Sequence, residues 1–211
     1  MRLQGKVSII TGAGGGMGRV AAQMFAAEGA KVVVAEFSEE AGEETAALVR
    51  AAGGVATFVK VDVSKESDAK AMVDHAVATY GRLDCLYNNA GIMPEADHSV
   101  TDTDVATWDA VMAVNVRGVY LGCKFAVPAM EAGGGGSIIN IASFVAILGC
   151  SVPQDAYTAS RPVQGRWRLS GSPLARTGRP GCASARALLP STPCRHPAGR
   201  CSPGWPRNWR C

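Results

Sequence analysis

A glycine-rich loop between an apolar run and an amphipathic segment constrains the fold of this chain most strongly. The loop reads Thr-Gly-Ala-Gly-Gly-Gly-Met-Gly over residues 11–18 and follows the apolar run Val7–Ile10. Glycines let the backbone turn sharply and approach a phosphate, and a following helix offers unpaired N–H groups and a positive dipole end. The glycines stand at Gly12, Gly16 and Gly18, which departs from the G-x-G-x-x-G fingerprint. The segment predicts a site for the pyrophosphate of a dinucleotide; a plain tight turn is the alternative.

Apolar and β-branched runs alternate with helical patterns along the first three quarters of the chain. The predicted strands are Val7–Ile10, Lys31–Ala35, Val55–Val61, Leu83–Tyr87 and Ser137–Ile141. The expected apolar face of the first helix comprises Met17, Val20, Ala21, Met24 and Phe25. Further helices are predicted to begin near Ser38, to cover Ala69–Tyr80 and to run from about Asp104 to Met130. Because strands and helices alternate, we predict an α/β fold with a doubly wound parallel sheet.

The charge distribution divides the chain at residue 160. Residues 1–160 contain 11 Lys and Arg against 18 Asp and Glu, whereas residues 161–211 contain 10 Arg and no Lys, Asp or Glu. Prolines interrupt the second segment and leave it no periodic apolar face. We therefore predict one domain over residues 1–160 and a disordered or out-of-frame tail over residues 161–211. A basic arm for nucleic acid or membranes is the alternative for the tail, but its Cys and Trp content argues against that role.

Composition excludes several classes of protein. The chain of 211 residues can form one sizeable core. No apolar run approaches the ~20 residues that span a bilayer, and the first apolar run is too short for a signal peptide. We therefore expect a cytoplasmic protein without a membrane partner. The seven cysteines lack the paired spacing of metal ligands, so we expect no metal, and Cys85, Cys123 and Cys150 are expected to be reduced.

Polar motifs follow three of the predicted strands. Glu36 ends the second strand, where an acid about twenty residues beyond a glycine loop can accept hydrogen bonds from ribose hydroxyls and repel a 2′-phosphate. Asp62 and Val63 end the third strand, and Asn-Asn-Ala-Gly over residues 88–91 directly follows the fourth. Ligands of open parallel sheets bind at this carboxyl edge. A solvated charge is the alternative for Glu36, and a helix cap is the alternative for Asp62. The residues Pro94, Glu95, Asp97 and His98 of the next loop could line a polar pocket or face water, and we expect them to face water.

These motifs, taken in order, resemble the short-chain dehydrogenase/reductase family. The resemblance rests on the Thr-Gly-x-x-x-Gly-x-Gly loop, the Asn-Asn-Ala-Gly segment, and then Asn115, Ser143 and Tyr157 with its Tyr-Thr-Ala-Ser start. It covers residues 1–160 and implies a Rossmann-like fold and an NAD-dependent oxidoreductase that interconverts a secondary alcohol and a ketone. The cofactor-binding residues implied are Thr11, Gly12, Gly16, Met17, Gly18, Glu36, Asp62, Val63, Asn89, Ala90 and Gly91.

The same resemblance implies the catalytic residues. Tyr157 would exchange a proton with the alcohol or carbonyl oxygen, Ser143 would hydrogen-bond that oxygen, and Asn115 would support a water relay. A phenol suits this task because neighbouring positive charge favours its ionised form. The position of the family's catalytic lysine is Arg161 here, which keeps the charge but has a planar fork and a different reach. Pro162 follows, and we expect it to end the helix that carries Tyr157 and Arg161.

The family's later strands and substrate-covering helix have no counterpart in the tail. One hypothesis is a reading frame that slips at codon 161. A one-base shift regroups degenerate codons for Arg161–Leu169 into a lysine and a helix-forming sequence, and those for Leu188–Pro193 into Pro-Ala-Pro-Val-Asn-Thr, which resembles a family segment. We therefore expect weak or no activity, and the alternatives are an inactive NAD-binding module or a misfolded truncated product. The family forms homo-oligomers, which the loss of a contributing helix disfavours here.

Overall fold

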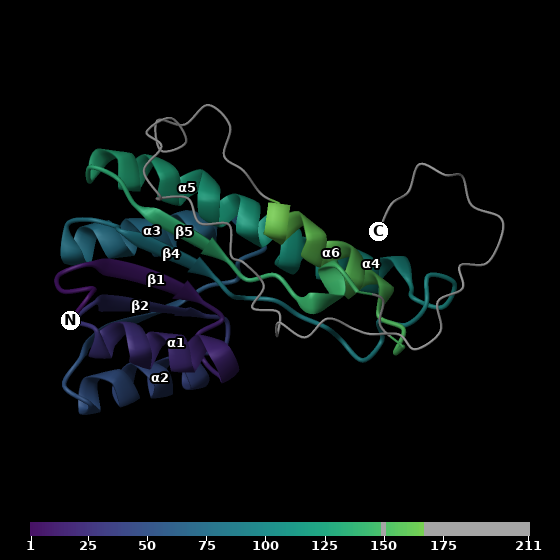
Figure 1. Ribbon diagram of the computed structural model, residues 1–211, viewed down its shortest axis with the longest axis horizontal. Helices are drawn as coiled ribbons and strands as arrows, with labels where there is room; N and C mark the ends of the chain where they lie inside the picture. The colour runs from purple at the N-terminus through teal and green to yellow at the C-terminus, as the bar shows by residue number, and fades with distance from the viewer. Residues whose placement is uncertain (149–150, 167–211) are drawn as a thin grey trace, which may run out of the picture.

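The computed structural model describes residues 1–148 and 151–166, which form one parallel sheet with helices on both faces (Figure 1). The strands are β1 (Val7–Thr11), β2 (Lys31–Glu36), β3 (Val55–Lys60), β4 (Cys85–Asn88) and β5 (Ser137–Asn140). Their order in the sheet is β3-β2-β1-β4-β5, with every pairing parallel. The predicted doubly wound α/β fold is therefore confirmed, and β3 and β5 form the edges of the described sheet.

Helices connect the strands and cover the sheet. They are α1 (Gly16–Ala27), α2 (Glu39–Ala51), α3 (Glu66–Tyr80), α4 (Val105–Met112), α5 (Gly118–Ala132) and α6 (Asp155–Arg166). A π-helical turn over Ala113–Arg117 joins α4 to α5, and a 3-10 turn over Phe144–Ala146 follows β5. Helices α1 and α2 lie on one face of the sheet, and α3 and α5 lie on the other (Figure 1). The predicted helix from Asp104 to Met130 therefore exists, with a π-helical turn inside it.

The core consists of two apolar clusters, one on each face of the sheet. Successive side chains of a strand point to opposite faces, so neighbouring residues of β1 and β2 enter different clusters. Ile9 and Val33 belong to the cluster beneath α3 and α5, whereas Ile10 and Val34 belong to the cluster beneath α1 and α2. Burial on both faces explains why the central strands read as unbroken apolar runs.

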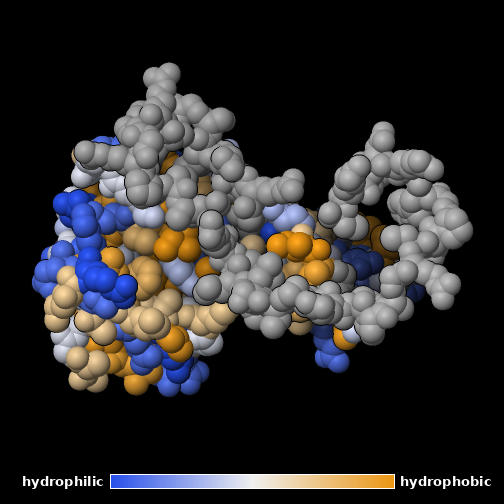
Figure 2. All heavy atoms as spheres, in the orientation of Figure 1, coloured by the Kyte–Doolittle hydropathy of each residue, from blue (hydrophilic) through white to orange (hydrophobic). Residues whose placement is uncertain are grey.

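The buried face of α1 differs in part from the prediction, because Ala21 is buried and Phe25 packs against the core but the other three predicted residues do not. Met17, Val20 and Met24 are 67%, 52% and 61% exposed, and the surface over α1 and α2 shows hydrophobic residues among hydrophilic ones (Figure 2). The buried residues of the helix are Gly18, Ala21, Ala22 and Ala26. Small side chains let the helix backbone lie close to the sheet and to the glycine loop. The face of α1 that packs is therefore the one with small side chains, because only that face allows a close approach to the sheet.

Among the described residues, Val105–Ala132 is the one helical stretch long and apolar enough to span a bilayer. The expectation that no such stretch occurs is therefore wrong as a statement about composition. Helix α5 packs against α3 and β4, and 44% of the most apolar part of the stretch is buried. Its place against the sheet accounts for its apolar residues.

Helix α6 contains Pro162 inside it and continues to Arg166, so the prediction that Pro162 ends the helix is wrong. A proline in a helix interior removes one hydrogen bond and crowds a carbonyl, at a cost of about 3 kcal/mol. Ser160 and Arg161, in the turn before the proline, are buried and hydrogen-bonded to other elements, and these contacts offset that cost. The helix also crosses residue 160, the predicted domain boundary. The predictions for the tail beyond residue 166 lie outside the described residues.

Asp84 anchors the start of β4 to β1. Its buried carboxylate accepts hydrogen bonds from the Val7 amide at 3.0 Å, from Lys6 Nζ at 3.0 Å and from Arg82 Nε and Nη2 at 2.8 and 2.6 Å. Burial alone would raise the pKa of this carboxyl, but the hydrogen bonds from Arg82, the Val7 amide and Lys6 outweigh it and hold the pKa below its ordinary value. The charged form of Asp84 is therefore part of the folded state.

We predict that Asp84→Asn lowers the free energy of unfolding by about 2–3 kcal/mol at pH 7, because it removes the negative charge to which Lys6 and Arg82 donate hydrogen bonds. Since the folded-state pKa of Asp84 is lowered, this stabilisation is present above the unfolded-state pKa and is lost as the pH falls through the folded-state pKa. The two proteins should therefore converge in stability in strong acid. Chemical denaturation at pH 7 and in acid measures both effects.

Asp74→Asn is the matched control. Its carboxylate is exposed and pairs with Lys70 one helical turn away, an interaction worth about 0.3–0.5 kcal/mol. Equal losses of stability in the two variants would contradict the anchoring role of Asp84.

Candidate functional site

The site lies where the strand order reverses. The chain leaves β3 at one edge of the sheet and returns to β4 beside β1. The connection after β1 leads to β2 on one side, and the connection after β4 leads to β5 on the other side, so the loops that follow these two neighbouring strands diverge. Crevices of this kind, outside the carboxyl ends of the strands, are where open α/β sheets bind ligands. The glycine loop follows β1, and the Asn-Asn-Ala-Gly segment follows β4.

Thr11 and Asn89 join these two loops by hydrogen bonds. Thr11 Oγ1 accepts from the amides of Asn89 and Ala90, each at 3.1 Å. In return, Asn89 Nδ2 donates to the carbonyls of Thr11 at 3.1 Å and Gly12 at 3.0 Å. Thr11 is only 2% exposed, so it supports the loops from below and does not face a ligand.

The glycines of the loop are required for different reasons. Gly12 has φ +63°, and a Cβ there would lie 2.8 Å from Ala90 Cα. A Cβ on Gly18 would lie 2.1 Å from the Gly12 carbonyl oxygen, whereas Gly16, with φ +49°, faces open space. Gly15 at the N-cap of α1 provides no side-chain cap, and the first turn has no acid. The amides and positive dipole end of α1 are therefore suited to an anion.

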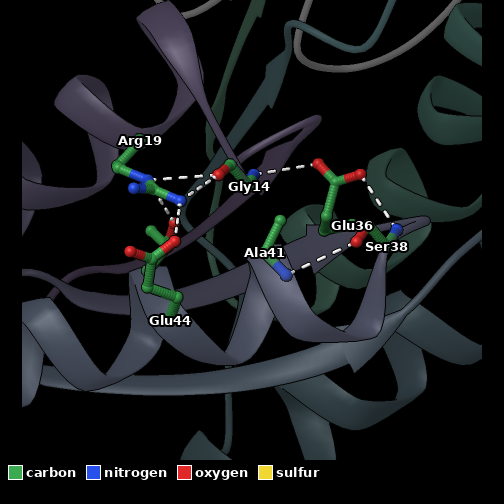
Figure 3. A network of polar contacts seen from close by, with 7 residues as sticks. Gly14, Arg19, Glu36, Ser38, Ala41 and Glu44 are labelled. Atoms are coloured by element: carbon green, nitrogen blue, oxygen red, sulfur yellow. Dashed lines mark hydrogen bonds and ion pairs between the residues drawn. The ribbon is translucent and has the colours of Figure 1, made fainter.

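A polar network fixes the middle of the glycine loop (Figure 3). The Gly14 amide donates to Glu36 Oε2 at 2.9 Å, and the Gly14 carbonyl accepts from Arg19 Nε and Nη2 at 3.1 and 2.5 Å. Arg19 also donates to Glu44 Oε2 at 2.5 Å and to Thr45 Oγ1 at 3.0 Å, both on α2. The loop is therefore held between the end of β2 and α2. Arg19 directly follows the last glycine of the loop, but no sequence motif indicated its role.

Glu36 retains capacity to accept a hydrogen bond from a ligand. Its Oε1 accepts from the amides of Phe37 at 2.8 Å and Ser38 at 3.2 Å, and its Oε2 accepts only from Gly14 among the hydrogen bonds observed. An ionised carboxylate has about four acceptor positions, so one remains on Oε2. The side chain is half-buried and lines a cavity, so it is more than a solvated charge at a strand end.

This cavity has a volume of about 670 Å³ and lies over the crevice between β1 and β4. The predicted cofactor residues that line it are Gly12, Glu36, Asp62, Val63, Asn89, Ala90 and Gly91. The lining residues that the sequence did not indicate include Phe37, Ile92, Ala110, Ala113 and Val114. The last three belong to the long helix, and periodicity alone could not show which of its faces covers the crevice.

Asp62 both lines the cavity and closes a turn. Its Oδ1 accepts from the amide of Ser64 at 3.0 Å and from its hydroxyl at 2.6 Å. Burial by itself would raise the pKa of the Asp62 carboxyl, but the two hydrogen bonds from Ser64 and the nearby charge of Lys65 outweigh it and lower the pKa. The carboxylate therefore stays charged at the rim of the cavity.

A second cavity, of about 360 Å³, adjoins the first. Ser143, Tyr157, Arg161 and Met17 line it, and three residues line both cavities: Asn89, Gly91 and Ile92. The structure thus brings three of the four predicted catalytic residues together. The predicted site residues that line neither cavity are Thr11, Gly16, Gly18 and Asn115.

Asn115 joins three elements without facing a cavity. It is fully buried in the π-helical turn, where its Oδ1 accepts from the Ile92 amide at 2.8 Å. Its Nδ2 donates to the Ile92 carbonyl and to Ser160 Oγ of α6, each at 3.0 Å. The water relay implied for Asn115 stays a prediction, since its observed contacts are structural.

Arg161, on α6, lines the second cavity and lies beside Gly91, which lines both cavities. Its guanidinium carbon lies 4.4 Å from the ring centroid of Tyr157, and its Nη1 donates to the Ile141 carbonyl at 3.3 Å. A Cβ on Gly91 would lie 2.4 Å from Nη2, so the guanidinium fills the space beside that glycine. Burial lowers the pKa of Arg161 while Tyr157 raises it, and an arginine remains charged under such shifts.

Asp97 contradicts the expectation that it faces water. It is 4% exposed, and its carboxylate accepts hydrogen bonds from two amides at the start of α6. No local sequence pattern could have shown this, because the partners lie about sixty residues apart in the chain.

Within residues 1–148 and 151–166, no three His, Cys, Asp or Glu side chains gather in a way that could hold a metal ion. Cys123 is buried and Cys85 is half-buried, and neither forms a disulfide bond. Burial, with a contribution from the charge of Asp84, raises the pKa of Cys85 to about 12. Cys150 and the cysteines of the tail lie outside the described residues.

Comparison with known proteins agrees with this geometry. Residues 6–163 match the family model described as short chain dehydrogenase. The chain is 48% identical over 149 residues to an uncharacterized oxidoreductase of Thermotoga maritima, covering 71% of this chain and 58% of that protein. It is 36% identical over 177 residues to a 2,5-dichloro-2,5-cyclohexadiene-1,4-diol dehydrogenase of Sphingobium indicum, covering 83% of this chain and 69% of that protein.

A crystal structure described as a short-chain dehydrogenase/reductase from Burkholderia xenovorans superimposes with a TM-score of 0.73 at 38% identity. The match covers 77% of this chain and 66% of that one. The chain therefore spans between about half and two thirds of the length of these relatives. The matched region contains the glycine loop, the segment after β4 and Tyr157, which are the motifs that carry the resemblance. The chain belongs to the short-chain dehydrogenase family.

Proposed function

We propose that this chain forms the cofactor-binding and proton-transfer part of an NAD-dependent oxidoreductase that interconverts a secondary alcohol and a ketone. The observation that carries the proposal is that Asn89, Gly91 and Ile92 line both cavities. A dinucleotide held along the crevice would therefore extend toward Ser143 and Tyr157. The Sphingobium relative, whose name states a cyclic diol as substrate, supports an alcohol as the substrate class.

The residues of the first cavity fit a dinucleotide. The uncapped N-terminus of α1 suits a pyrophosphate, and Gly12 leaves no side chain in the crevice. Glu36 keeps an acceptor position for a ribose hydroxyl, and its negative charge would repel a 2′-phosphate, which favours NAD over NADP. When bound, the nicotinamide of such a cofactor accepts or supplies the hydride.

The residues of the second cavity supply the proton chemistry. During oxidation, the Tyr157 oxygen takes the proton of the substrate hydroxyl, and during reduction it returns that proton. Ser143 Oγ hydrogen-bonds the same substrate oxygen and orients it, since Ser143 and Tyr157 line one small cavity. Ile92 and Met93 form part of its wall.

A catalytically inactive NAD-binding module is the second candidate, and the placement of Arg161 favours it. The guanidinium packs on the ring face of Tyr157 and beside Gly91, at the junction of the two cavities. A lysine at this position would present a compact, mobile charge, whereas the arginine places a planar fork there. Cofactor binding without turnover would distinguish this candidate from an active enzyme.

We predict that Glu36→Gln narrows the preference for NADH over NADPH by about tenfold or more, because it removes the like charge that faces a 2′-phosphate. The glutamine carbonyl can still accept from the Gly14 amide, but its NH2 group then faces the Phe37 and Ser38 amides, so the prediction concerns the ratio of the two affinities and not either affinity alone. Titration of each reduced cofactor by its fluorescence measures both dissociation constants. Glu39→Gln is the control, because Glu39 is exposed on α2 and pairs only with Lys60 in the ion pairs observed. An unchanged preference in Glu36→Gln would contradict the assigned role.

We predict that Arg161→Lys raises the turnover of the chain with NAD and secondary alcohols by about tenfold or more, because the planar fork leaves the cavity junction while the positive charge stays. The measurement is NADH formation across a panel of secondary alcohols. Arg50→Lys, an exposed change on α2, should leave the rate as it is. Equal turnover in the parent chain and Arg161→Lys would show that the arginine does not impair catalysis. Binding of NADH by both, with no turnover in either, would favour the inactive module.

A further inference from the structure

The N-terminus of α6 is capped by a side chain from elsewhere in the chain. Gln154 is the N-cap residue, because its carbonyl accepts the first helical hydrogen bond, from the Thr158 amide at 2.9 Å. Asp, Asn, Ser or Thr at an N-cap normally accepts from the second or third helical amide, and glutamine is not among these residues. Those two amides belong to Ala156 and Tyr157, and they donate instead to Asp97 Oδ1 at 3.0 Å and Oδ2 at 2.8 Å.

The contacts between the loop that carries Asp97 and the start of α6 are reciprocal. The Asp155 amide donates to the His98 carbonyl at 3.0 Å, and Asp155 Oδ2 accepts from the Val100 amide at 2.8 Å. Together with the two bonds of Asp97, four hydrogen bonds fix the loop to the first turn of α6. A buried carboxylate with both oxygens engaged by backbone amides has little freedom to move.

The loop that carries Asp97 also forms the cofactor crevice. Gly91 and Ile92 stand at its beginning and line both cavities. The amide that Asp97 holds at 2.8 Å is that of Tyr157 itself. One end of the loop therefore shapes the crevice, and the other fixes the backbone of the residue that faces it.

We propose that Asp97 is a positioning residue for Tyr157, which sets the place of the phenol relative to the cofactor crevice; this inference rests on the proposed function. A local N-cap residue could satisfy the same two amides without joining the helix to the loop. Asp97 does both, because its carboxylate reaches the helix from the loop that forms the cavity wall. Asn115 provides a second link one turn later through Ser160, so the helix is held at two levels.

The test separates capping from positioning with two variants of the full chain. Asp97→Ala removes both the cap and the link to the loop. Asp97→Ala combined with Gln154→Asp restores a capping carboxylate at the N-cap and preserves the net charge, but does not restore the link. Asp102→Ala is the control, because Asp102 is an exposed carboxylate of the same loop that bonds Ser99. Each protein is measured for amide exchange at Ala156 and Tyr157, for the ¹³C resonance of the Tyr157 ring, for NADH dissociation and for kcat.

The expected result is a division between the two variants. Asp97→Ala exchanges the Ala156 and Tyr157 amides faster, shifts the Tyr157 ring resonance and lowers kcat by about tenfold to hundredfold, because a small displacement of a reacting group is costly. The double variant regains amide protection but keeps the shifted resonance and the low kcat. NADH dissociation stays unchanged in both, and Asp102→Ala behaves as the parent chain does.

Recovery of the parent ring resonance and of kcat together with amide protection in the double variant would overturn the proposal, because capping alone would then explain Asp97. An unshifted resonance in Asp97→Ala would also overturn it. The proposed function fails separately, if the parent chain binds no NADH. In that case the ligand-free resonance of the Tyr157 ring, assigned with Tyr157→Phe, still decides the role of Asp97.

Discussion

The hydrogen bonds between Thr11 and the turn after β4 are the contact on which the rest of the site depends. They bring the carboxyl ends of β1 and β4 together, so the glycine loop and the Asn89–Ala90 turn form one surface. The glycines then shape this surface, since a side chain at Gly12 or Gly18 would meet backbone atoms. The N-terminus of α1, which has no side-chain cap, presents its amides at this surface, where an anion can accept from them.

The two ends of the site depend on different parts of the chain. The crevice is formed by residues at the carboxyl ends of β1, β2, β3 and β4 and by the long helix, and Arg19 and Glu36 brace the glycine loop from either side. The cavity of Tyr157 depends instead on α6, which is held by long-range contacts to Asp97 and Asn115. The two cavities therefore depend on different long-range contacts, although Asn89, Gly91 and Ile92 line both. Arg161 stands at the junction of the two.

Local patterns predicted the sheet, its helices and the residues at the carboxyl edge, because periodicity and glycine spacing are local properties. The predicted face of α1 was wrong for Met17, Val20 and Met24, because Ala21 and Ala22 allow a closer approach than larger apolar residues do. The predicted end of α6 at Pro162 was wrong because tertiary contacts outweigh the cost of the proline. Helix propensity alone cannot show such contacts. Asp97 escaped prediction for the same reason, since its partners are distant in sequence.

Amide hydrogen exchange of the chain with and without NADH tests whether the loops at the carboxyl edge of the sheet form one cofactor site. We predict that NADH slows exchange in the glycine loop over residues 11–18, in residues 36–38 and 62–64 and in the turn over residues 88–92, because these segments form one cavity. Helix α3, on the far face of the sheet, should be unaffected. Protection confined to another surface, such as the open groove beside Arg117 and Tyr120, or no protection at all, would contradict it.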